Sequence, residues 1–465
     1  MKNNNNMKGC YPPLGQAWIS VSILSLTYLV SFMDRQILIL LIDPIKNDLQ
    51  ISDTQVSLLT GLAFAIIYTT ACVPMGRLSD LWVRKYVIIG GVFFWSLMTI
   101  LCGFARNFSQ LFMARMGVGL GEAALTPAAY AMIGDLFPPH KLARGISIFA
   151  LAGLAGGGLS LVFGGMVIGF VEQIGTLYVP LIGEMRSWQV VLLAVGGLSF
   201  LMIIPLSWMP EPKRHHKKLG SLQAGTANEP QSDAMTFAEV LKYFWGYKAF
   251  YGLFILGCAI NNVAGFGLAT WVPNYFIRVH DWSPSTAGVT LGTLYLIPAI
   301  TGGLVAGWLA DFLYGKGLRS APFTIMVGVL PPMILLVSLF IYIPDVQMKM
   351  GILGLFYLFE TTYSVLFPTV ILMATPSFIR AQVSALTLLL VNLVGFGFGP
   401  LIVALVTDYV FKDNMAVGSS ILTVGVSAYS IGGMVLFFAL KPFKARVMAI
   451  TEEAPQSVAE RNVSS

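Results

Sequence analysis

Charged side chains are scarce in this sequence, because Asp, Glu, Lys and Arg make up only 11% of its 465 residues. A soluble domain carries about 25% charged residues, which keep its surface hydrated. Hydrophobic residues instead reach 56%, and the mean hydropathy is +0.76. Most of the surface must therefore face lipid, which excludes a chain of ordinary soluble domains.

Cysteine and histidine are also rare, with four residues of each. The cysteines show no paired spacing, so the sequence predicts neither a disulfide framework nor a zinc site. The histidines lie in loops or at the ends of apolar runs, and no nucleophile elbow or phosphate-binding loop accompanies them. We therefore expect no enzyme activity, no metal and no cofactor. The sequence also lacks a nucleotide-binding domain, which excludes an ATP-driven pump.

Long apolar runs fill most of the chain, and a helix needs about 20 such residues to cross a bilayer. The runs lie near 17–41, 55–78, 86–104, 108–131, 145–170, 188–209, 250–277, 286–309, 322–343, 351–374, 382–407 and 416–440. We predict an all-α membrane protein with twelve transmembrane helices in two pseudo-symmetric six-helix bundles. Pro127, Pro298, Pro368 and Pro400 fall inside these runs and predict kinks. The many glycines in the runs predict close helix packing.

Lysine and arginine are concentrated in the loops that lie on the same side of the predicted membrane as the N-terminus. This distribution places both termini in the cytoplasm. The net charge of +6 is then a signal of topology, and we expect no nucleic-acid partner. The predicted parts are a cytoplasmic tail (1–16), an N-terminal bundle (17–209), a cytoplasmic linker (210–249), a C-terminal bundle (250–440) and a cytoplasmic tail (441–465). Within the linker, 236–248 predicts a short amphipathic helix on the inner membrane surface.

One loop motif occurs twice. Gly76-Arg77-Leu78-Ser79-Asp80 follows the second run, and Gly307-Trp308-Leu309-Ala310-Asp311 follows the eighth. Such a repeat is typical of transporters that are built from two related halves. The first copy resembles the signature loop of the major facilitator superfamily, although Val83 stands where that family usually has glycine.

The loop motif suggests an inner gate. We expect its charges to form a network that holds this gate closed, the alternative being a loop that only sets topology. The candidate gating residues are Gly76, Asp80, Arg84, Lys85, Gly307 and Asp311.

A second motif, Leu111-x-x-x-Arg115-x-x-x-Gly119-x-Gly121, resembles the fourth helix of the same superfamily. Together with Asp34-Arg35 and the run from Gly117 to Ala123, it is similar to the Spinster-like branch. This resemblance implies alternating access, proton coupling at the matching acidic positions, and lysophospholipids or sphingolipids as substrates in animal relatives.

Five charged residues fall inside predicted spans: Asp34, Arg35, Arg115, Glu122 and Glu360. Each costs ~2.5–3.5 kcal/mol at a helix centre, so we expect pairing or hydration inside a cavity. Arg115 and Glu122 share one helix face, and their depths predict that Asp34 faces Arg115 with Glu122 deeper. Our hypothesis makes Glu122 the main proton carrier, Asp34 the second and Arg115 their switchable partner. The alternative is a static salt bridge that fixes helix packing.

Several polar residues in the spans are candidates for substrate binding. Arg35 is expected either to anchor an anionic group or to make a structural bond. For each of the other candidates, the alternative role is a structural hydrogen bond between helices. These candidates are Asn261, Asn262, Glu360, Thr361, Tyr363 and Asn392. With few charges and many aromatic residues, the predicted substrate is an amphipathic or lysolipid-like molecule.

Two alternatives to this function stay open: a proton-coupled symporter of small organic anions and a non-transporting membrane receptor. We expect a monomer in contact with membrane lipids. The Asn-rich start and the short loops indicate a bacterial inner membrane.

Overall fold

The computed structural model describes residues 11–174, 177–179, 183–212, 237–376 and 379–463. The chain divides into two compact units. Unit 1 comprises residues 1–229 and 273–296, and unit 2 comprises 230–272 and 297–465. The segment 273–296, which we call the strap, was predicted to belong to the C-terminal bundle and groups with unit 1. The predicted linker from 213 to 236 lies outside the described residues.

Unit 1 is almost entirely helical, because its apolar runs satisfy their backbone polar groups only within helices when they face lipid. Its helices are α1 (Leu14–Leu40), α2 (Ile42–Leu49), α3 (Asp53–Ser57), the π-helical turn η1 (Leu58–Leu62), α4 (Ala63–Leu81), α5 (Arg84–Gly103), α6 (Phe108–Glu122), α7 (Leu125–Leu136), α8 (Pro139–Ile174), α9 (Ser187–Leu201) and α10 (Ile203–Trp208). A short antiparallel hairpin of β1 (Leu177–Val179) and β2 (Gly183–Met185) joins α8 to α9, with Tyr178 opposite Glu184.

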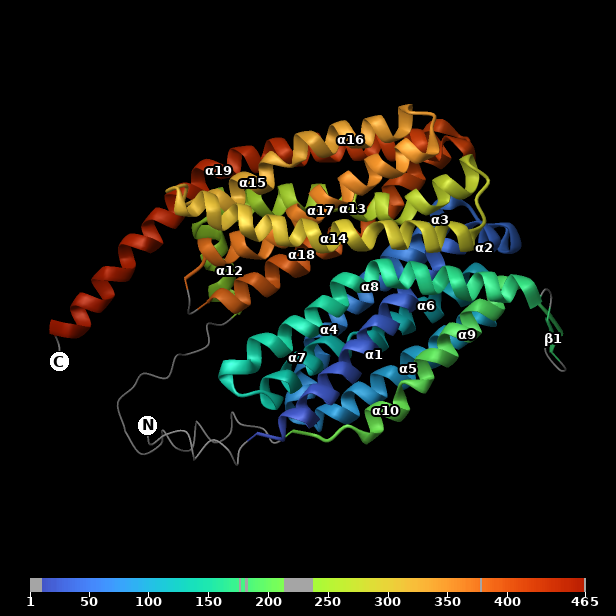
Figure 1. Ribbon diagram of the computed structural model, residues 1–465, viewed down its shortest axis with the longest axis horizontal. Coiled ribbons are helices and arrows are strands. Elements are labelled where there is room, and N and C mark those ends of the chain that lie inside the picture. Colours follow the sequence, from blue (N-terminus) through green and yellow to red (C-terminus); the bar gives the residue numbers. More distant parts are fainter. Residues whose placement is uncertain (1–10, 175–176, 180–182, 213–236, 377–378, 464–465) are drawn as a thin grey trace. The chain divides into compact units, whose positions relative to one another are not determined.

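In unit 1, α1 packs along α8 (Figure 1), and α5 packs against both α6 and α9. Trp95, Trp188, Phe64 and Phe149 are fully or almost fully buried there. The strap consists of the end of α13 and the beginning of α14.

Unit 2 repeats the helical pattern. Its elements are α12 (Phe237–Gly246), α13 (Lys248–Val279), α14 (Pro284–Gly315), α15 (Ala321–Gly328), α16 (Leu330–Tyr342), α17 (Val346–Ala374), α18 (Arg380–Leu405), the π-helical η3 (Val406–Phe411), the 3-10 turn η4 (Asn414–Ala416) and α19 (Val417–Val463). The helix α12 is present where the sequence of 236–248 predicted one. The last helix continues well beyond the predicted membrane boundary at residue 440.

Eleven helical segments of the described chain are long and apolar enough to cross a membrane. The remaining predicted span, 108–131, is divided between α6 and α7, which have 15 and 12 residues. The break follows from Pro127, because proline has no N–H to donate to the carbonyl four residues earlier, that of Ala123. Pro298, Pro368 and Pro400 instead lie inside continuous helices.

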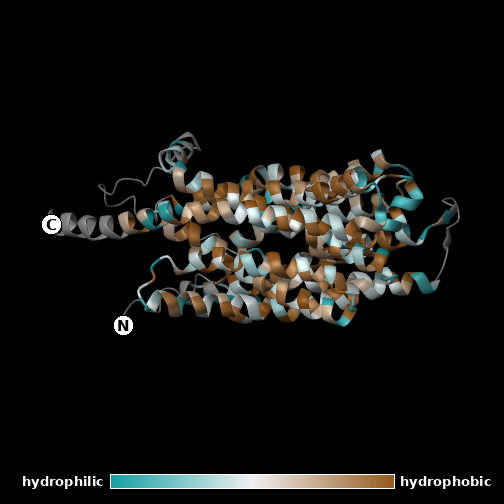
Figure 2. Cartoon of the chain, turned by 90° about the horizontal axis from the view of Figure 1, so that it is seen from above, coloured by the Kyte–Doolittle hydropathy of each residue, from teal (hydrophilic) through white to brown (hydrophobic). Residues whose placement is uncertain are grey.

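Hydrophobic residues line most of the length of these helices, whereas hydrophilic ones gather toward helix ends and loops (Figure 2). Large side chains such as Trp208, Phe170 and Phe437 are more than half exposed. A monomeric soluble protein rarely exposes so much apolar surface, whereas lipid contact requires it. The all-α membrane architecture predicted from composition is therefore confirmed.

Candidate functional site

A buried ion pair joins α1 to α6 in the middle of unit 1. The Arg35 Nε lies 2.6 Å from the Glu122 Oε2, and the Ser31 hydroxyl donates to the same oxygen at 2.7 Å. The Glu122 side chain is completely buried, and that of Arg35 is 14% exposed. The Glu122 carboxylate thus has one charged partner and one hydroxyl partner, both supplied by α1.

Aromatic rings surround the arginine of this pair. The Arg35 Cζ lies 4.6 Å from the ring centre of Tyr68, 4.7 Å from that of Phe64 and 5.3 Å from that of Phe32. Each contact is close enough for a cation–π interaction, which stabilises a desolvated guanidinium. Arg35 therefore keeps its charge in an apolar setting through Glu122 and these ring faces.

Asp34 points away from this pair, because adjacent residues of a helix are separated by about 100°. Its Oδ2 accepts a hydrogen bond of 2.7 Å from the Ser199 hydroxyl on α9. The Arg115 Nη1 donates to the Asp34 backbone carbonyl at 3.2 Å. Asp34 and Arg115 are 0% and 1% exposed. In the described part of the chain, no hydrogen-bond partner was found for the Asp34 Oδ1.

These contacts differ from the predicted pairing in one respect. Asp34, Arg115 and Glu122 do come together in the core of unit 1, as the sequence predicted. The ion-pair partner of Glu122, however, is Arg35, while Arg115 binds the backbone of α1. Helical periodicity fixes which residues share a face of one helix, but it does not fix which face of α1 turns toward α6.

Glycines allow α6 to approach its neighbours closely enough for these contacts. A Cβ at Gly121 would lie 2.8 Å from the Gly91 carbonyl oxygen, and one at Gly119 would lie 3.0 Å from the Phe64 carbonyl oxygen. Any larger residue would push α6 away from α5 and α4. The packing role predicted for these glycines is thereby confirmed.

The first copy of the loop motif contacts distant parts of unit 1. The buried Arg84 forms an ion pair with Asp135 on α7 and lies 4.0 Å from Asp80, whose side chain is 71% exposed. The Glu211 carboxylate, just after α10, accepts from the backbone N–H groups of Arg84 and Lys85 at 3.0 and 2.9 Å. Glu211 thus caps the N-terminus of α5, where a negative charge is favourable.

The backbone conformation explains why the loop accommodates Val83 where the signature loop usually has glycine. Val83 precedes α5 with φ −65° and ψ 112°, an extended conformation that any residue adopts. Glycine is therefore not required at this position. Gly76 is half-buried, and a Cβ there would lie 3.6 Å from Pro127, an ordinary contact.

The second loop copy in unit 2 has a simpler environment. Gly307 and Asp311 are exposed, and a Cβ at Gly307 would meet nothing within 4 Å. Among the described residues, Asp311 forms no ion pair. The two copies therefore share a motif without sharing its ion pairs.

The polar candidates of unit 2 lie at several places. The buried Asn261 donates to the Tyr363 hydroxyl at 3.3 Å, and Asn262 packs on Gly395. Thr361 is buried against Gly302, Glu360 is half-buried and Asn392 is exposed. The structure brings Asn261 and Tyr363 together.

Sequence reasoning missed Ser31, Ser199, Asp135 and Glu211. Ser31 had a local signal, because it precedes Arg35 by four residues and so shares its helix face. The other three are contributed by distant segments, and no local pattern marks them.

Comparison with known proteins identifies the family. The Major Facilitator Superfamily profile matches residues 24–400. The chain belongs to the Major Facilitator Superfamily. This transporter is 26% identical over 311 residues to the probable L-galactonate transporter of Escherichia coli, covering 64% of this chain and 63% of that one. It is 24% identical over 346 residues to the sphingosine-1-phosphate transporter SPNS2 of Danio rerio, covering 71% and 63%.

A solved structure has the same fold. It is a bacterial homolog of the human lysosomal transporter Spinster in an inward-facing, unoccupied conformation, with a TM-score of 0.73 and 23% identity over 94% of this chain and 98% of that one. The predicted resemblance to the superfamily and to its Spinster-like members is confirmed, and the chain is a multi-pass membrane protein.

Proposed function

We propose that this transporter couples proton movement to the transport of an amphipathic, lysolipid-like anion by alternating access. Glu122 carries the proton, and Arg35 is its exchangeable partner. In this proposal both termini face the cytoplasm of a bacterial cell and the protein spans the inner membrane.

The Arg35–Glu122 pair is the observation that supports this function best. A carboxylate that loses its charge on protonation releases its arginine, and a free guanidinium binds a carboxylate or phosphate through two parallel hydrogen bonds. Proton and anionic substrate would then both act on the 2.6 Å contact between Arg35 and Glu122. Proton uptake at Glu122 would promote anion binding at Arg35.

Asp34 is the second proton site in this scheme, and Arg115 has a positioning role. The bond from Arg115 to the Asp34 backbone carbonyl fixes the section of α1 that carries Arg35. Asp34 itself is bound by Ser199 on α9. A proton on Asp34 would therefore act through the packing of α1 against α9.

The aromatic rings beside Arg35 favour a substrate with an apolar part next to its anionic group. Phe32, Phe64 and Tyr68 offer apolar faces at the arginine. The name of SPNS2 supports a lipid anion, and that of the galactonate transporter supports a small sugar acid. Both classes have the anionic group that Arg35 would bind, and they differ in the apolar tail. Asn261, Asn262, Glu360, Thr361, Tyr363 and Asn392 are the substrate contacts proposed in unit 2.

The loop residues Gly76, Asp80, Arg84, Lys85, Gly307 and Asp311 are assigned to the inner gate. The Arg84–Asp135 pair and the cap from Glu211 give the first loop the stronger attachment. Opening of this gate would require those contacts to rearrange.

The decisive experiment measures uptake by purified protein in proteoliposomes across a pH series. Glu122→Gln, which keeps the shape and removes the titration, is expected to flatten the pH dependence. Glu172→Gln is the matched control, because Glu172 is an exposed carboxylate on α8. An unchanged pH dependence in Glu122→Gln rejects the proton-carrier role.

Substrate class is tested separately by thermal stabilisation of the purified protein with lysolipids and with sugar acids. Stabilisation by lysolipids alone supports the leading proposal, and stabilisation by sugar acids alone supports the organic-anion alternative. Ligand binding without uptake of any bound ligand would indicate a receptor.

A further inference from the structure

A buried arginine joins two helices of unit 2 that are far apart in the sequence. Arg446 lies on α19, and its Nη2 donates to the Tyr243 hydroxyl on α12 at 2.7 Å. The Arg446 Cζ lies 3.8 Å from the ring centre of Tyr247, which follows α12, and 5.7 Å from that of Tyr243. Arg446 is 7% exposed. It therefore fixes the end of α12 to the part of α19 that lies beyond the predicted membrane boundary at residue 440.

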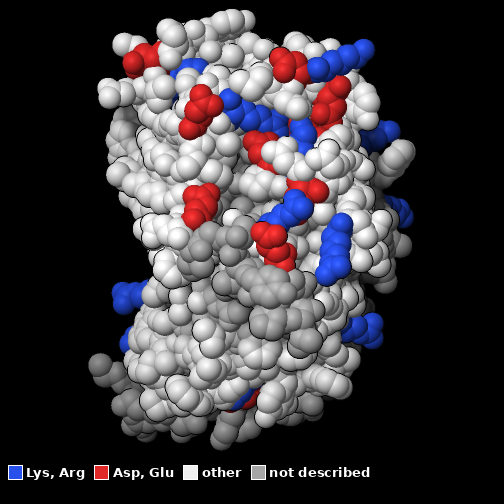
Figure 3. Space-filling view, turned by 90° about the vertical axis from the view of Figure 1, so that its right-hand side faces the viewer, with Lys and Arg blue, Asp and Glu red and all other residues white. Residues whose placement is uncertain are grey.

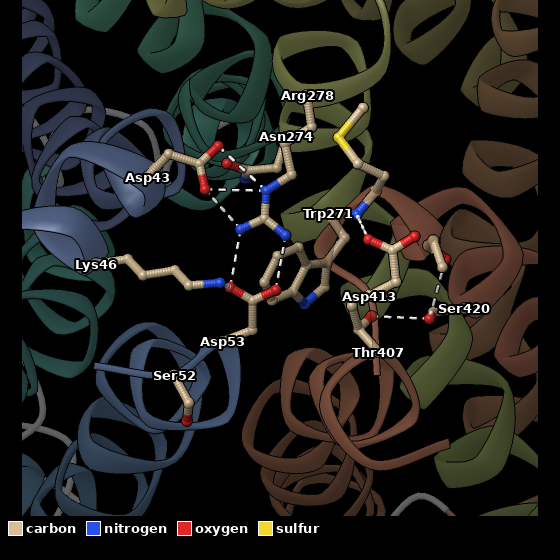
Figure 4. Close-up of polar contacts among 12 residues, drawn as sticks. Asp43, Lys46, Ser52, Asp53, Trp271, Asn274, Arg278, Thr407, Asp413 and Ser420 are labelled. Atoms are coloured by element: carbon tan, nitrogen blue, oxygen red, sulfur yellow. Dashed lines mark hydrogen bonds and ion pairs between the residues drawn. The ribbon is translucent and has the colours of Figure 1, made fainter. Parts of the chain in front are cut away.

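Arg446 makes this contact without an acidic partner. Among the described residues it forms no ion pair, and its Nε has no hydrogen-bond partner there. The buried Arg278 of unit 1 differs, because its guanidinium lies 2.6 Å from an oxygen of Asp43 and 2.6 Å from one of Asp53 (Figure 4). Lys46 also lies 2.7 Å from Asp53. The charge of Arg278 is thus neutralised by neighbouring carboxylates, whereas that of Arg446 is not.

Exposed lysines flank the Arg446 contact along both helices. The segments 242–250 and 441–450 contain no aspartate or glutamate. Their lysines are all exposed: Lys242, Lys248, Lys441 and Lys444. Figure 3 views the molecule from the end where α2 lies, and there acidic and basic side chains are interspersed. We call the exposed side chains of 242–250 and 441–450 the basic surface, because its charges are of one sign.

Exposed apolar side chains lie among these lysines. Trp245 is 73% exposed, and the Lys248 Nζ lies 4.9 Å from its ring centre. Met448 is 54% exposed and follows Lys444 by four residues, so the two share a face of α19. Tryptophan is enriched where hydrocarbon meets water at a membrane surface. The basic surface therefore combines positive charge with apolar contact area.

The basic surface lies where spans leave the membrane. A span of about 20 residues that begins with α19 at Val417 ends before Lys441. Another candidate span, α13, begins at Lys248, shortly after α12 ends at Gly246. Both segments are thus placed at the depth of the lipid headgroups.

We propose that the basic surface binds the anionic headgroups of membrane phospholipids, and that Arg446 is the positioning residue that holds α12 in it. Each lysine near an anionic membrane surface strengthens association about fivefold. A lipid fits this surface better than a soluble anion does, because Trp245 and Met448 offer apolar contact beside the charges. The inference depends on insertion of the chain in a membrane and is independent of the transported substrate and of proton coupling.

The first test maps lipid contacts by photo-crosslinking. Purified protein is placed in phosphatidylcholine vesicles that contain a small fraction of phosphatidylglycerol with a photoreactive headgroup, and crosslinked peptides are identified by mass spectrometry. We expect adducts on 242–250 and 441–450. The yield should fall at least about tenfold when all four lysines of the basic surface are replaced by glutamine. An equal yield in the parent from photoreactive phosphatidylcholine, whose headgroup has no net charge, would overturn the proposal.

The matched control compares two double variants of unit 2. Lys441→Gln with Lys444→Gln removes two charges from the basic surface. Lys316→Gln with Arg319→Gln removes two exposed charges from the loop between α14 and α15. Only the first double variant is expected to lower the adduct yield on 441–450. Equal losses in both would show an effect of net charge alone and would contradict the assignment to this surface.

The second test concerns the positioning role of Arg446. In Arg446→Gln, α12 loses its attachment to α19, so adducts on 242–250 should fall about fivefold or more while those on 441–450 remain. Arg446→Lys, which keeps the charge, should restore part of the yield. Tyr243→Phe removes only the hydroxyl and tests the same contact if Arg446→Gln does not fold. Equal losses on both segments, or no loss on either, would overturn the positioning role.

Competition distinguishes a lipid from a soluble anion. Sodium chloride should weaken crosslinking to the basic surface by screening its charges. Inorganic phosphate at the same ionic strength is expected to have no greater effect. A larger loss of adducts with inorganic phosphate than with sodium chloride would show a site for small anions and would overturn the assignment to lipid headgroups.

Discussion

Replacing Arg35 and Glu122 singly and together separates the contribution of their ion pair to the free energy of unfolding from the contributions of their other contacts. Arg35→Met keeps most of the side-chain stem while leaving the Glu122 carboxylate, among the described residues, with the Ser31 hydroxyl as its hydrogen-bond partner. Glu122→Leu leaves the guanidinium among aromatic rings without its counter-ion. The double variant replaces both charges by apolar groups of similar volume.

The expected magnitudes follow from burial. Breaking a buried pair costs about 3–5 kcal/mol, because one charge remains unpaired in an apolar setting. Glu122 is fully buried, but the 14% exposure of Arg35 lets water reach the site, so we expect about 3 kcal/mol for Arg35→Met. Replacing a whole buried pair by apolar residues is often close to neutral, so the double variant should lose less than either single one.

The assay is the free energy of unfolding in mixed micelles for the parent and all three variants. Cation–π contacts of Arg35 are lost in Arg35→Met and in the double variant alike, so they cancel in the double-mutant cycle. Because the double variant should lose less than either single one, the coupling energy should exceed about 3 kcal/mol. Additive losses, with the double variant the least stable, would refute the view that these two charges depend on each other.

Two further pairs of substitutions test helix packing and the loop motif with the same unfolding assay. Gly292→Ala places a Cβ 2.5 Å from the Gly158 carbonyl oxygen and should lower the free energy of unfolding by about 1–3 kcal/mol. The control Gly197→Ala, whose Cβ would have nothing within 4 Å, should raise it by about 0.5–1 kcal/mol. Equal effects would contradict the close packing of α14 on α8. Asp135→Asn leaves the buried Arg84 without its closest acid and should lower the free energy of unfolding by about 3 kcal/mol. The control Asp311→Asn, at an exposed residue, should stay within about 0.5 kcal/mol of the parent. An Asp135→Asn variant as stable as the parent would argue against the Arg84–Asp135 pair.

The helical membrane fold was predictable because its cause is compositional. Runs of about 20 apolar residues have few alternatives in lipid, and their limits appear in the sequence as loops rich in charge. The split of the fourth span at Ala123 and Ala124 was partly predicted, since Pro127 was expected to kink that helix. Whether a proline bends or divides a helix depends on neighbouring packing, which the sequence does not display.

The partners of the buried charges were less predictable. The cost of burying Glu122 predicts that a partner exists, but both Arg35 and Arg115 met the requirement of depth. The rotation of α1 decides between them, and this rotation depends on contacts such as that of Ser199 with Asp34, 165 residues away. The ion pair between Arg278 and Asp43 was missed for the same reason, because these two residues are 235 residues apart.

The two charge systems of unit 1 differ in what can disturb them. Among the described residues, Glu122 forms an ion pair with Arg35 alone, so in the proposed mechanism one proton or one competing anion would suffice to break that contact. Asp53 is held by both Arg278 and Lys46, and Arg278 also holds Asp43, so loss of any one contact leaves the others in place. The Arg35–Glu122 pair therefore suits the switching role proposed for it, whereas the contacts of Arg278 and Lys46 support one another. Because α1 contributes Arg35 to the first and leads directly into the helix that carries Asp43, a shift of α1 would reach both.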